Sequence, residues 1–206
     1  MSLVAADSGL LEPLRSFVKI ERKPTWGTCA GLILLAEAAN ATKQGGQELI
    51  GGLDVRVNRN HFGRQIESFQ ADLDLPFLTQ STNRAPFPGV FIRAPIVEKL
   101  LPHVEGEQQS EKAVSGTVVA PSRAAKDAVA QKAMSSQVEI MGVLPGRLKK
   151  VAAPGVHVGM GEAVGDIIAV KQGNVFGTSF HPELTSDIRI HVWWLEQVIK
   201  ATAVEQ

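Results

Sequence analysis

The residue best suited to covalent chemistry is Cys29, the single cysteine of the chain, which stands in Gly-Thr-Cys-Ala-Gly at residues 27–31. The apolar run Leu-Ile-Leu-Leu-Ala follows at once, so the stretch is typical of a strand end, a sharp turn and a helix start. At a helix N-terminus the free N–H groups lower the pKa of a thiol and can receive an oxyanion. The pattern therefore predicts a nucleophile with a lowered pKa. The alternative is a buried structural cysteine.

His181 and Glu183 are the second pair of candidates, and they directly follow the apolar stretch 175–180. Residues two positions apart in an extended segment point to the same side, so His181 can face the thiol while Glu183 orients its other ring nitrogen. Nucleophile, base and orienting carboxylate make up a catalytic triad. A lone histidine before a proline is more often a turn residue. The cysteine turn favours the functional interpretation, because α/β enzymes place reactive groups at the carboxyl ends of strands.

Composition narrows the classes of protein to which the chain can belong. With 206 residues it is long enough for one domain with a core, and its 21 basic and 21 acidic side chains give a net charge of zero. This balance argues against a nucleic-acid or anionic-membrane binder. A single cysteine excludes a disulfide framework and a cysteine-rich zinc site, and it fits a reducing compartment, so we expect a cytoplasmic protein.

The elements that must position these groups can be predicted from periodicity. Helical spacing predicts helices over 10–20 and from residue 30 to the glycines at 45–46, and alternation predicts strands at 53–57 and 69–75. Two apolar runs around a Gly-Asn turn predict a hairpin over 167–180. A final helix after residue 187 is expected to turn Ile188, Val192, Leu195, Val198 and Ile199 toward the core. Residues 103–165 lack a consistent period, so we expect a partly mobile insertion there.

Four motifs, in the same order along the chain, resemble one family. They are Gly-Thr-Cys-Ala-Gly-Leu-Ile-Leu-Leu-Ala at 27–36, Arg-Asn-His-Phe-Gly-Arg-Gln at 59–65, Gly-Val-Phe-Ile-Arg-Ala-Pro at 89–95 and Ser-Phe-His-Pro-Glu-Leu-Thr at 179–185. Together they resemble the class I glutamine amidotransferases, and more narrowly the glutaminase subunits of pyridoxal 5′-phosphate synthase. The resemblance implies one amidotransferase domain over residues 1–206, with an α/β, flavodoxin-like fold and a mixed central sheet.

The resemblance also implies an activity and its catalytic residues. L-Glutamine would be hydrolysed to glutamate and ammonia, and the ammonia would pass to the synthase subunit that builds vitamin B6. Cys29 would form a glutamyl thioester, His181 would transfer the protons, and Glu183 would hold the imidazole. The Ala30 N–H would contribute to the oxyanion hole, and no metal or organic cofactor is required.

Three further residues match the family's substrate-binding positions: Arg59, Ile92 and Arg93. Their chemistry fits, because a guanidinium can hold the carboxylate of a free amino acid with two hydrogen bonds. For each arginine alone, the alternative is a surface or ion-pair residue.

The beginning of the chain departs from the family pattern. Family members usually start with strands and a Gly-Gly-Glu-Ser loop, whereas this chain starts near the helix that follows that loop. We therefore expect an N-terminally truncated member that lacks the usual first strands and one oxyanion donor, a loss that typically costs about 10²–10³ in rate. The alternative function is a catalytically impaired form that acts only as a synthase-binding partner. A peptidase on a related fold is a third possibility, against which the Arg59 and Arg93 motifs argue.

Overall fold

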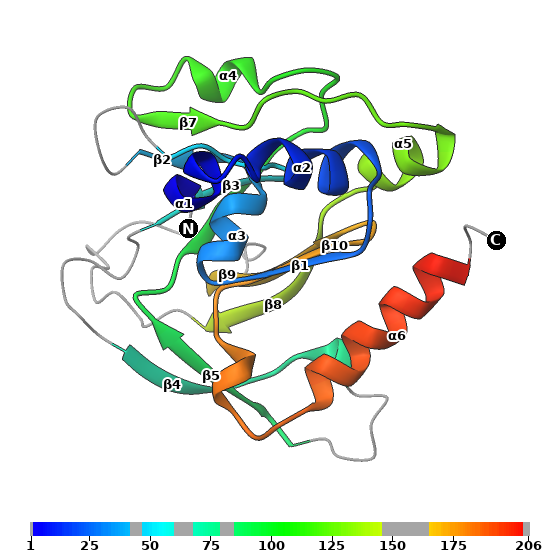
Figure 1. Ribbon diagram of the computed structural model, residues 1–206. Coiled ribbons are helices and arrows are strands. Elements are labelled where there is room, and N and C mark those ends of the chain that lie inside the picture. The colour runs from blue at the N-terminus through cyan, green and yellow to red at the C-terminus, as the bar shows by residue number, and fades with distance from the viewer. Residues whose placement is uncertain (1, 42–46, 60–67, 79–84, 146–164, 204–206) are drawn as a thin grey trace, which may run out of the picture.

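The structure, a computed structural model, describes residues 2–41, 47–59, 68–78, 85–145 and 165–203 (Figure 1). Within these residues the strands are β1 Thr25–Thr28, β2 Ala36–Asn40, β3 Leu53–Asn58, β4 Ser68–Leu73, β5 Phe87–Ile92, β6 Ile96–Leu100, β7 Thr117–Val119, β8 Glu139–Pro145, β9 Gly165–Gln172 and β10 Val175–Thr178. The main sheet is mixed, with the order β1-β10-β9-β6-β3-β2-β7, and β8 also pairs with β9. Strands β4 and β5 form a separate antiparallel pair.

The helices lie on both sides of the β1–β10 pair. They are α1 Ser2–Asp7, α2 Leu11–Arg15, α3 Ala30–Leu35, α4 Gln109–Lys112, α5 Ala128–Met134 and α6 Arg189–Ala203, with a π-helical turn η1 Ser16–Ile20 and 3-10 turns η2 Pro76–Leu78 and η3 Pro182–Leu184. Figure 1 shows α2 and α3 on one side of β1 and α6 on the other. Within the described residues, no helix is both long and apolar enough to cross a membrane.

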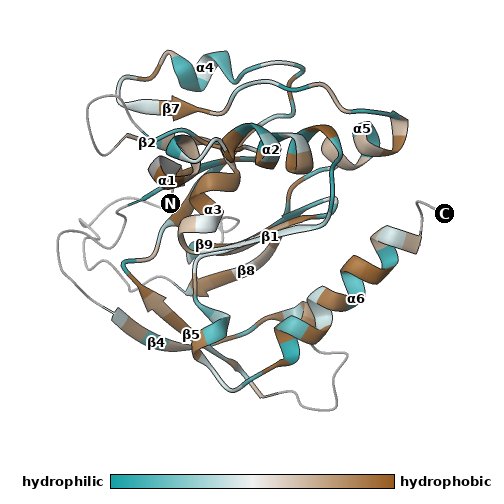
Figure 2. Ribbon diagram, viewed as in Figure 1, coloured by the Kyte–Doolittle hydropathy of each residue, from teal (hydrophilic) through white to brown (hydrophobic). Residues whose placement is uncertain are grey.

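The short helix α3 packs very closely on β1 and β10. It is apolar along almost its whole length (Figure 2), and Leu32 and Leu35 belong to the core beneath it. Gly27 pairs with Gly177 across the two parallel strands. A Cβ on Gly27 would lie 2.5 Å from the carbonyl carbon of Gly31, and one on Gly177 would lie 2.6 Å from a methyl group of Leu32. The paired glycines therefore provide the space that α3 occupies.

A second core of aromatic side chains holds α6 to the sheet. Phe176 of β10 is fully buried, and its ring lies 5.0 Å from that of Trp193 and 6.0 Å from that of Trp194. Trp26 of β1 contacts Phe176 at 5.4 Å between ring centroids. Offset and tilted rings at these separations attract one another beyond their burial of apolar surface. This cluster fixes the start of α6, and with it the segment that joins β10 to α6.

The prediction of which face of α6 packs on the core is wrong. Four of its five residues are exposed, with fractions of 68% for Ile188, 47% for Val192, 60% for Leu195 and 66% for Ile199. Val198 is half-buried, and the fully buried residue is Ile190. Aromatic rings bury more area than aliphatic side chains, so the face that carries the two tryptophans packs on the sheet instead. The described part of α6 thus carries an apolar stripe that is open to solvent.

The predicted helix from residue 30 is correct only as far as Leu35. Residues Ala36–Asn40 form β2, which pairs with β3 in parallel and with β7 in antiparallel orientation. Within β2 the buried Glu37 carboxylate lies 2.9 Å from Nζ of Lys19 and accepts a 2.8 Å hydrogen bond from the Gly52 N–H. Strand pairing and a buried ion pair here override the helical propensity of alanine. The glycines at 45–46 lie outside the described residues.

Other predicted elements are confirmed, including β3, β4 and the β9–β10 hairpin, which turns at Gly173 and Asn174. Of the segment 103–165, residues 109–145 contribute α4, β7, α5 and β8, and both of these strands join the main sheet. Residues 146–164 lie outside the described residues.

The contact between α3 and β1 gives a test of the fold. Gly27→Ala would place a methyl group against backbone atoms that cannot rotate away, so we expect the free energy of unfolding to fall by about 1–3 kcal/mol. Gly31→Ala is the matched control, because its Cβ would meet nothing within 4 Å. Urea denaturation of both variants measures the difference. Equal stabilities would contradict this account of the packing.

Candidate functional site

Cys29 occupies a strained turn between β1 and α3. Its backbone has φ 48° and ψ −103°, in a region that residues with a side chain rarely adopt. The Cys29 N–H donates a 2.7 Å hydrogen bond to the carbonyl oxygen of Thr178, which directly precedes the segment leading to His181. The last bond of the β1–β10 ladder and the start of α3 thus hold the thiol at the carboxyl end of both strands.

His181 and Glu183 form a hydrogen-bonded pair just beyond β10. Nδ1 of His181 lies 2.7 Å from Oε1 of Glu183. The carboxylate accepts, so we assign the proton to Nδ1, which leaves Nε2 free to take up a proton. The backbone N–H of His181 donates a 2.8 Å hydrogen bond to the carbonyl oxygen of Val90 in β5. The predicted orienting role of Glu183 therefore has the geometry it requires.

Strand β5 ties the histidine and the cysteine to one place. Sγ of Cys29 lies 3.9 Å from the carbonyl oxygen of Ile92, two residues after the Val90 carbonyl that binds His181. Two residues of a strand span about 6.4–6.8 Å, so both candidates contact one short length of backbone. Figure 1 shows the ends of β1, β10 and β5 directed toward the side where α3 begins.

The predicted lowering of the Cys29 pKa is wrong. Burial raises the pKa of this thiol, and the negative charge of Glu183 acts in the same direction. The Ala30 N–H, which hydrogen-bonds to the sulfur, and the Arg93 charge only partly offset these effects. Helix α3 is short, and the loss of water around the sulfur outweighs its N-terminal field. The expected oxyanion donor, the Ala30 N–H, is thus within hydrogen-bonding reach of the sulfur.

Ile92 and Arg93 end β5 beside the thiol. Both are exposed, and Arg93 has a positive φ of 46°. This conformation follows directly on the Ile92 carbonyl that contacts Cys29, and the guanidinium is close enough for its charge to lower the thiol's pKa. Arg93 is therefore a cation exposed to solvent at the predicted site.

Arg59 follows β3 and is buried, with 6% of its surface exposed. Its Nη1 donates to Oε1 of Gln47 at 2.8 Å, and its backbone N–H donates to Oδ1 of Asn40 at 2.7 Å. Both acceptors are neutral, and within the described residues no carboxylate pairs with the guanidinium. Burial accordingly lowers its pKa. These contacts of Arg59 are with residues near β2 and β3 and not with Cys29. Residues 60–65 of its motif lie outside the described residues.

The sequence reasoning missed the backbone groups that assemble the site. The carbonyl oxygens of Thr178, Val90 and Ile92 anchor Cys29 and His181. The only signal for two of them was the short apolar run Val-Phe-Ile at 90–92, which indicates a buried strand. In the described part of the chain, no group of three or more His, Cys, Asp or Glu residues is placed to hold a metal ion.

Comparisons with known proteins agree with this architecture. The model of the SNO glutamine amidotransferase family matches residues 1–135 and 124–200. The probable pyridoxal 5′-phosphate synthase subunit PDX2 of Arabidopsis thaliana is 42% identical over 197 residues, which are 95% of this chain and 66% of that protein. The pyridoxal 5′-phosphate synthase subunit PdxT of Thermococcus onnurineus is 33% identical over 97% of this chain and 71% of its own.

A solved glutamine amidotransferase structure superposes with a TM-score of 0.59 at 29% identity, covering 96% of this chain and 72% of that one. The predicted α/β fold with a mixed central sheet is thereby confirmed. The chain spans about two thirds of the length of the curated relatives named above. It belongs to the SNO glutamine amidotransferase family.

Proposed function

We propose that this chain is the glutaminase subunit of a pyridoxal 5′-phosphate synthase, which hydrolyses L-glutamine and passes the ammonia to the synthase subunit. The observation that carries the proposal is the strained Cys29 turn at the same sheet end as the His181–Glu183 pair. Family membership and the names of the relatives support the choice of substrate and partner.

The reaction begins with a proton transfer. Because burial raises the thiol's pKa, Cys29 is protonated at rest, and Nε2 of His181 must take its proton as Sγ attacks the carboxamide carbon. Glu183 accepts the Nδ1–H hydrogen bond and stabilises the imidazolium that forms. The Ala30 N–H hydrogen-bonds to the oxyanion of the tetrahedral intermediate.

Collapse of this intermediate breaks the C–N bond. The imidazolium gives its proton to the leaving nitrogen, ammonia departs, and a glutamyl thioester remains on Cys29. His181 then removes a proton from water as the water oxygen attacks the thioester carbon. Glutamate leaves with the new oxygen, and the proton returns to the sulfur, so the enzyme is unchanged after one turnover.

Two arginines are the candidates for binding the substrate. We assign the glutamine carboxylate to Arg59 or Arg93, since a guanidinium without a carboxylate partner retains its full charge for the ligand. Arg93 and the Ile92 carbonyl lie at the thiol and would contact the substrate near the reacting centre. The mechanism requires no metal or organic cofactor. The single free cysteine suits a reducing compartment, and we place the protein in the cytoplasm.

An alternative is that the chain binds the synthase but has lost activity. No contact described above favours this alternative. Pull-down of the synthase subunit together with undetectable ammonia release from glutamine would support it, and absence of binding would eliminate it.

The proposed function is tested by kinetics of Glu183→Gln. The amide cannot stabilise the imidazolium, so we expect kcat for ammonia release to fall about 10²–10⁴-fold in the presence of the synthase subunit. Cys29→Ser should be inactive, and Glu196→Gln, an exposed change on α6, should behave as wild type. Glutaminase activity that survives in Cys29→Ser would sink the proposal.

The pH dependence of the thiol gives an independent prediction. Only the thiolate reacts with iodoacetamide, so the alkylation rate of Cys29 should rise with pH and reach half its maximum above the ordinary thiol pKa of about 8.5. Arg93→Gln removes a charge that lowers this pKa, so its midpoint should move further up. Glu183→Gln removes a charge that raises the pKa, so its midpoint should move down. A wild-type midpoint well below the ordinary value would show that burial does not dominate.

A further inference from the structure

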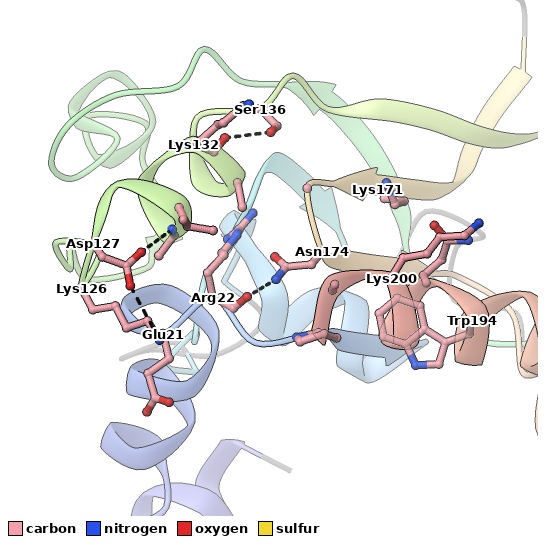
Figure 3. A pocket seen from close by; sticks show the side chains of 17 residues that line it. Glu21, Arg22, Lys126, Asp127, Lys132, Ser136, Lys171, Asn174, Trp194 and Lys200 are labelled. Carbon is pink, nitrogen blue, oxygen red and sulfur yellow. Dashed lines mark hydrogen bonds and ion pairs between the residues drawn. The ribbon is translucent and has the colours of Figure 1, made fainter. Parts of the chain in front are cut away.

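A cavity of about 700 Å³ lies at the end of the β1–β10 pair opposite to Cys29. Pro24 precedes β1 and Gly173–Asn174 precede β10, so the cavity opens at the amino ends of the strands that carry the thiol and His181 at their carboxyl ends. Figure 3 shows its walls, which are α5, the β9–β10 turn and the second half of α6. Its volume lies in the usual range for small-molecule sites.

The walls of this cavity are strongly positive, although the whole chain has no net charge. Five cationic side chains and two acidic ones line it: Arg22, Lys126, Lys132, Lys171 and Lys200 against Glu21 and Asp127. The cations come from segments far apart in the sequence, and Figure 3 shows them around one space. The local excess of charge therefore belongs to the cavity and not to a single basic stretch.

The four lysines of the cavity differ in whether they have a carboxylate partner. Lys171 lies 3.4 Å from Oε1 of Glu139, and Lys126 lies 3.8 Å from Oδ2 of Asp127. Across the described residues, Lys132 on α5 and Lys200 on α6 form no ion pair. Both residues line the cavity, on α5 and α6, and both are exposed to solvent.

The buried Arg22 adds a fixed charge behind these lysines. Only 1% of its surface is exposed, and it donates hydrogen bonds to the backbone oxygens of Gly52 at 2.8 Å and Gln172 at 3.0 Å. Its Nε has no hydrogen-bond partner among the described residues. Burial lowers its pKa to about 10, so the guanidinium remains charged at neutral pH. Its hydrogen-bond acceptors are neutral, while the charges of Asp54 and Glu37 lie near enough to raise its pKa and offset part of its positive charge.

The remaining walls offer apolar surface. Trp194 and Val129 line the cavity, and the Trp194 ring, which stacks on Phe176, presents its remaining surface as an apolar wall. Lysine ammonium groups act as point charges that bind phosphate groups. A ligand that uses both features carries a phosphate and a ring.

We propose that this cavity is a second binding site, which takes a phosphorylated small molecule with an aromatic ring. The phosphate lies between Lys132 and Lys200, and the ring lies against the Trp194 wall. The site is separate from the proposed glutaminase centre, so its occupancy can be measured without any turnover of glutamine.

Calorimetric titration of the full chain with ADP, and separately with inorganic phosphate, tests the proposal. We expect ADP to bind at near-physiological salt, and to bind more tightly than phosphate because the ring adds its own contact. The double variant Lys132→Gln/Lys200→Gln should weaken ADP binding about tenfold or more, equivalent to about 1.4 kcal/mol. Lys112→Gln, an exposed change on α4 outside the cavity, is the control and should bind as wild type.

Two results would overturn the proposal. One is that neither probe binds the wild-type chain, and the other is that the double variant binds ADP as tightly as wild type. Equal affinities for ADP and phosphate would contradict the role of the Trp194 wall. Thermal unfolding of each variant checks that the exposed substitutions leave the fold intact.

Discussion

The site depends on one close approach, that of helix α3 to the paired strands β1 and β10. Gly27 and Gly177 face each other across this ladder, and neither position has room for a side chain. Because the helix starts immediately after the strand, Cys29 is forced into a positive φ and its thiol is presented at the strand end. The same ladder continues into the segment that carries His181. The proposed nucleophile and the proposed base, distant in sequence, are thus placed by a single pair of strands.

The candidate site residues could be predicted because they stand in short motifs. The turn around Cys29 and the spacing of His181 and Glu183 are set by neighbouring residues and by strand periodicity. That Ala36–Asn40 form a strand could not be predicted, because alanines favour a helix. Here the pairing with β3 and β7 outweighs that preference. The buried face of α6 was predicted wrongly for a similar reason. Both the aliphatic stripe and the tryptophans could pack on the sheet, and only the tertiary structure determines which of them does.

The direction in which the pKa of Cys29 shifts also could not be predicted from the sequence. A helix N-terminus alone lowers a cysteine pKa, yet here burial and Glu183 raise it. In the proposed mechanism His181 must therefore act as a base, with proton transfer during attack and no preformed thiolate. The cationic cavity at the opposite strand ends could not be predicted either, because its lysines come from α5, the segment before it, β9 and α6. Only the fold brings such scattered charges together.

The central claim is that Cys29 becomes acylated during turnover. Acid quench of the chain mixed with L-glutamine and the synthase subunit, followed by mass spectrometry of the peptide that contains Cys29, measures this directly. The account predicts a glutamyl group on that sulfur. Ammonia release without any adduct on Cys29, or with the adduct on another residue, would contradict it.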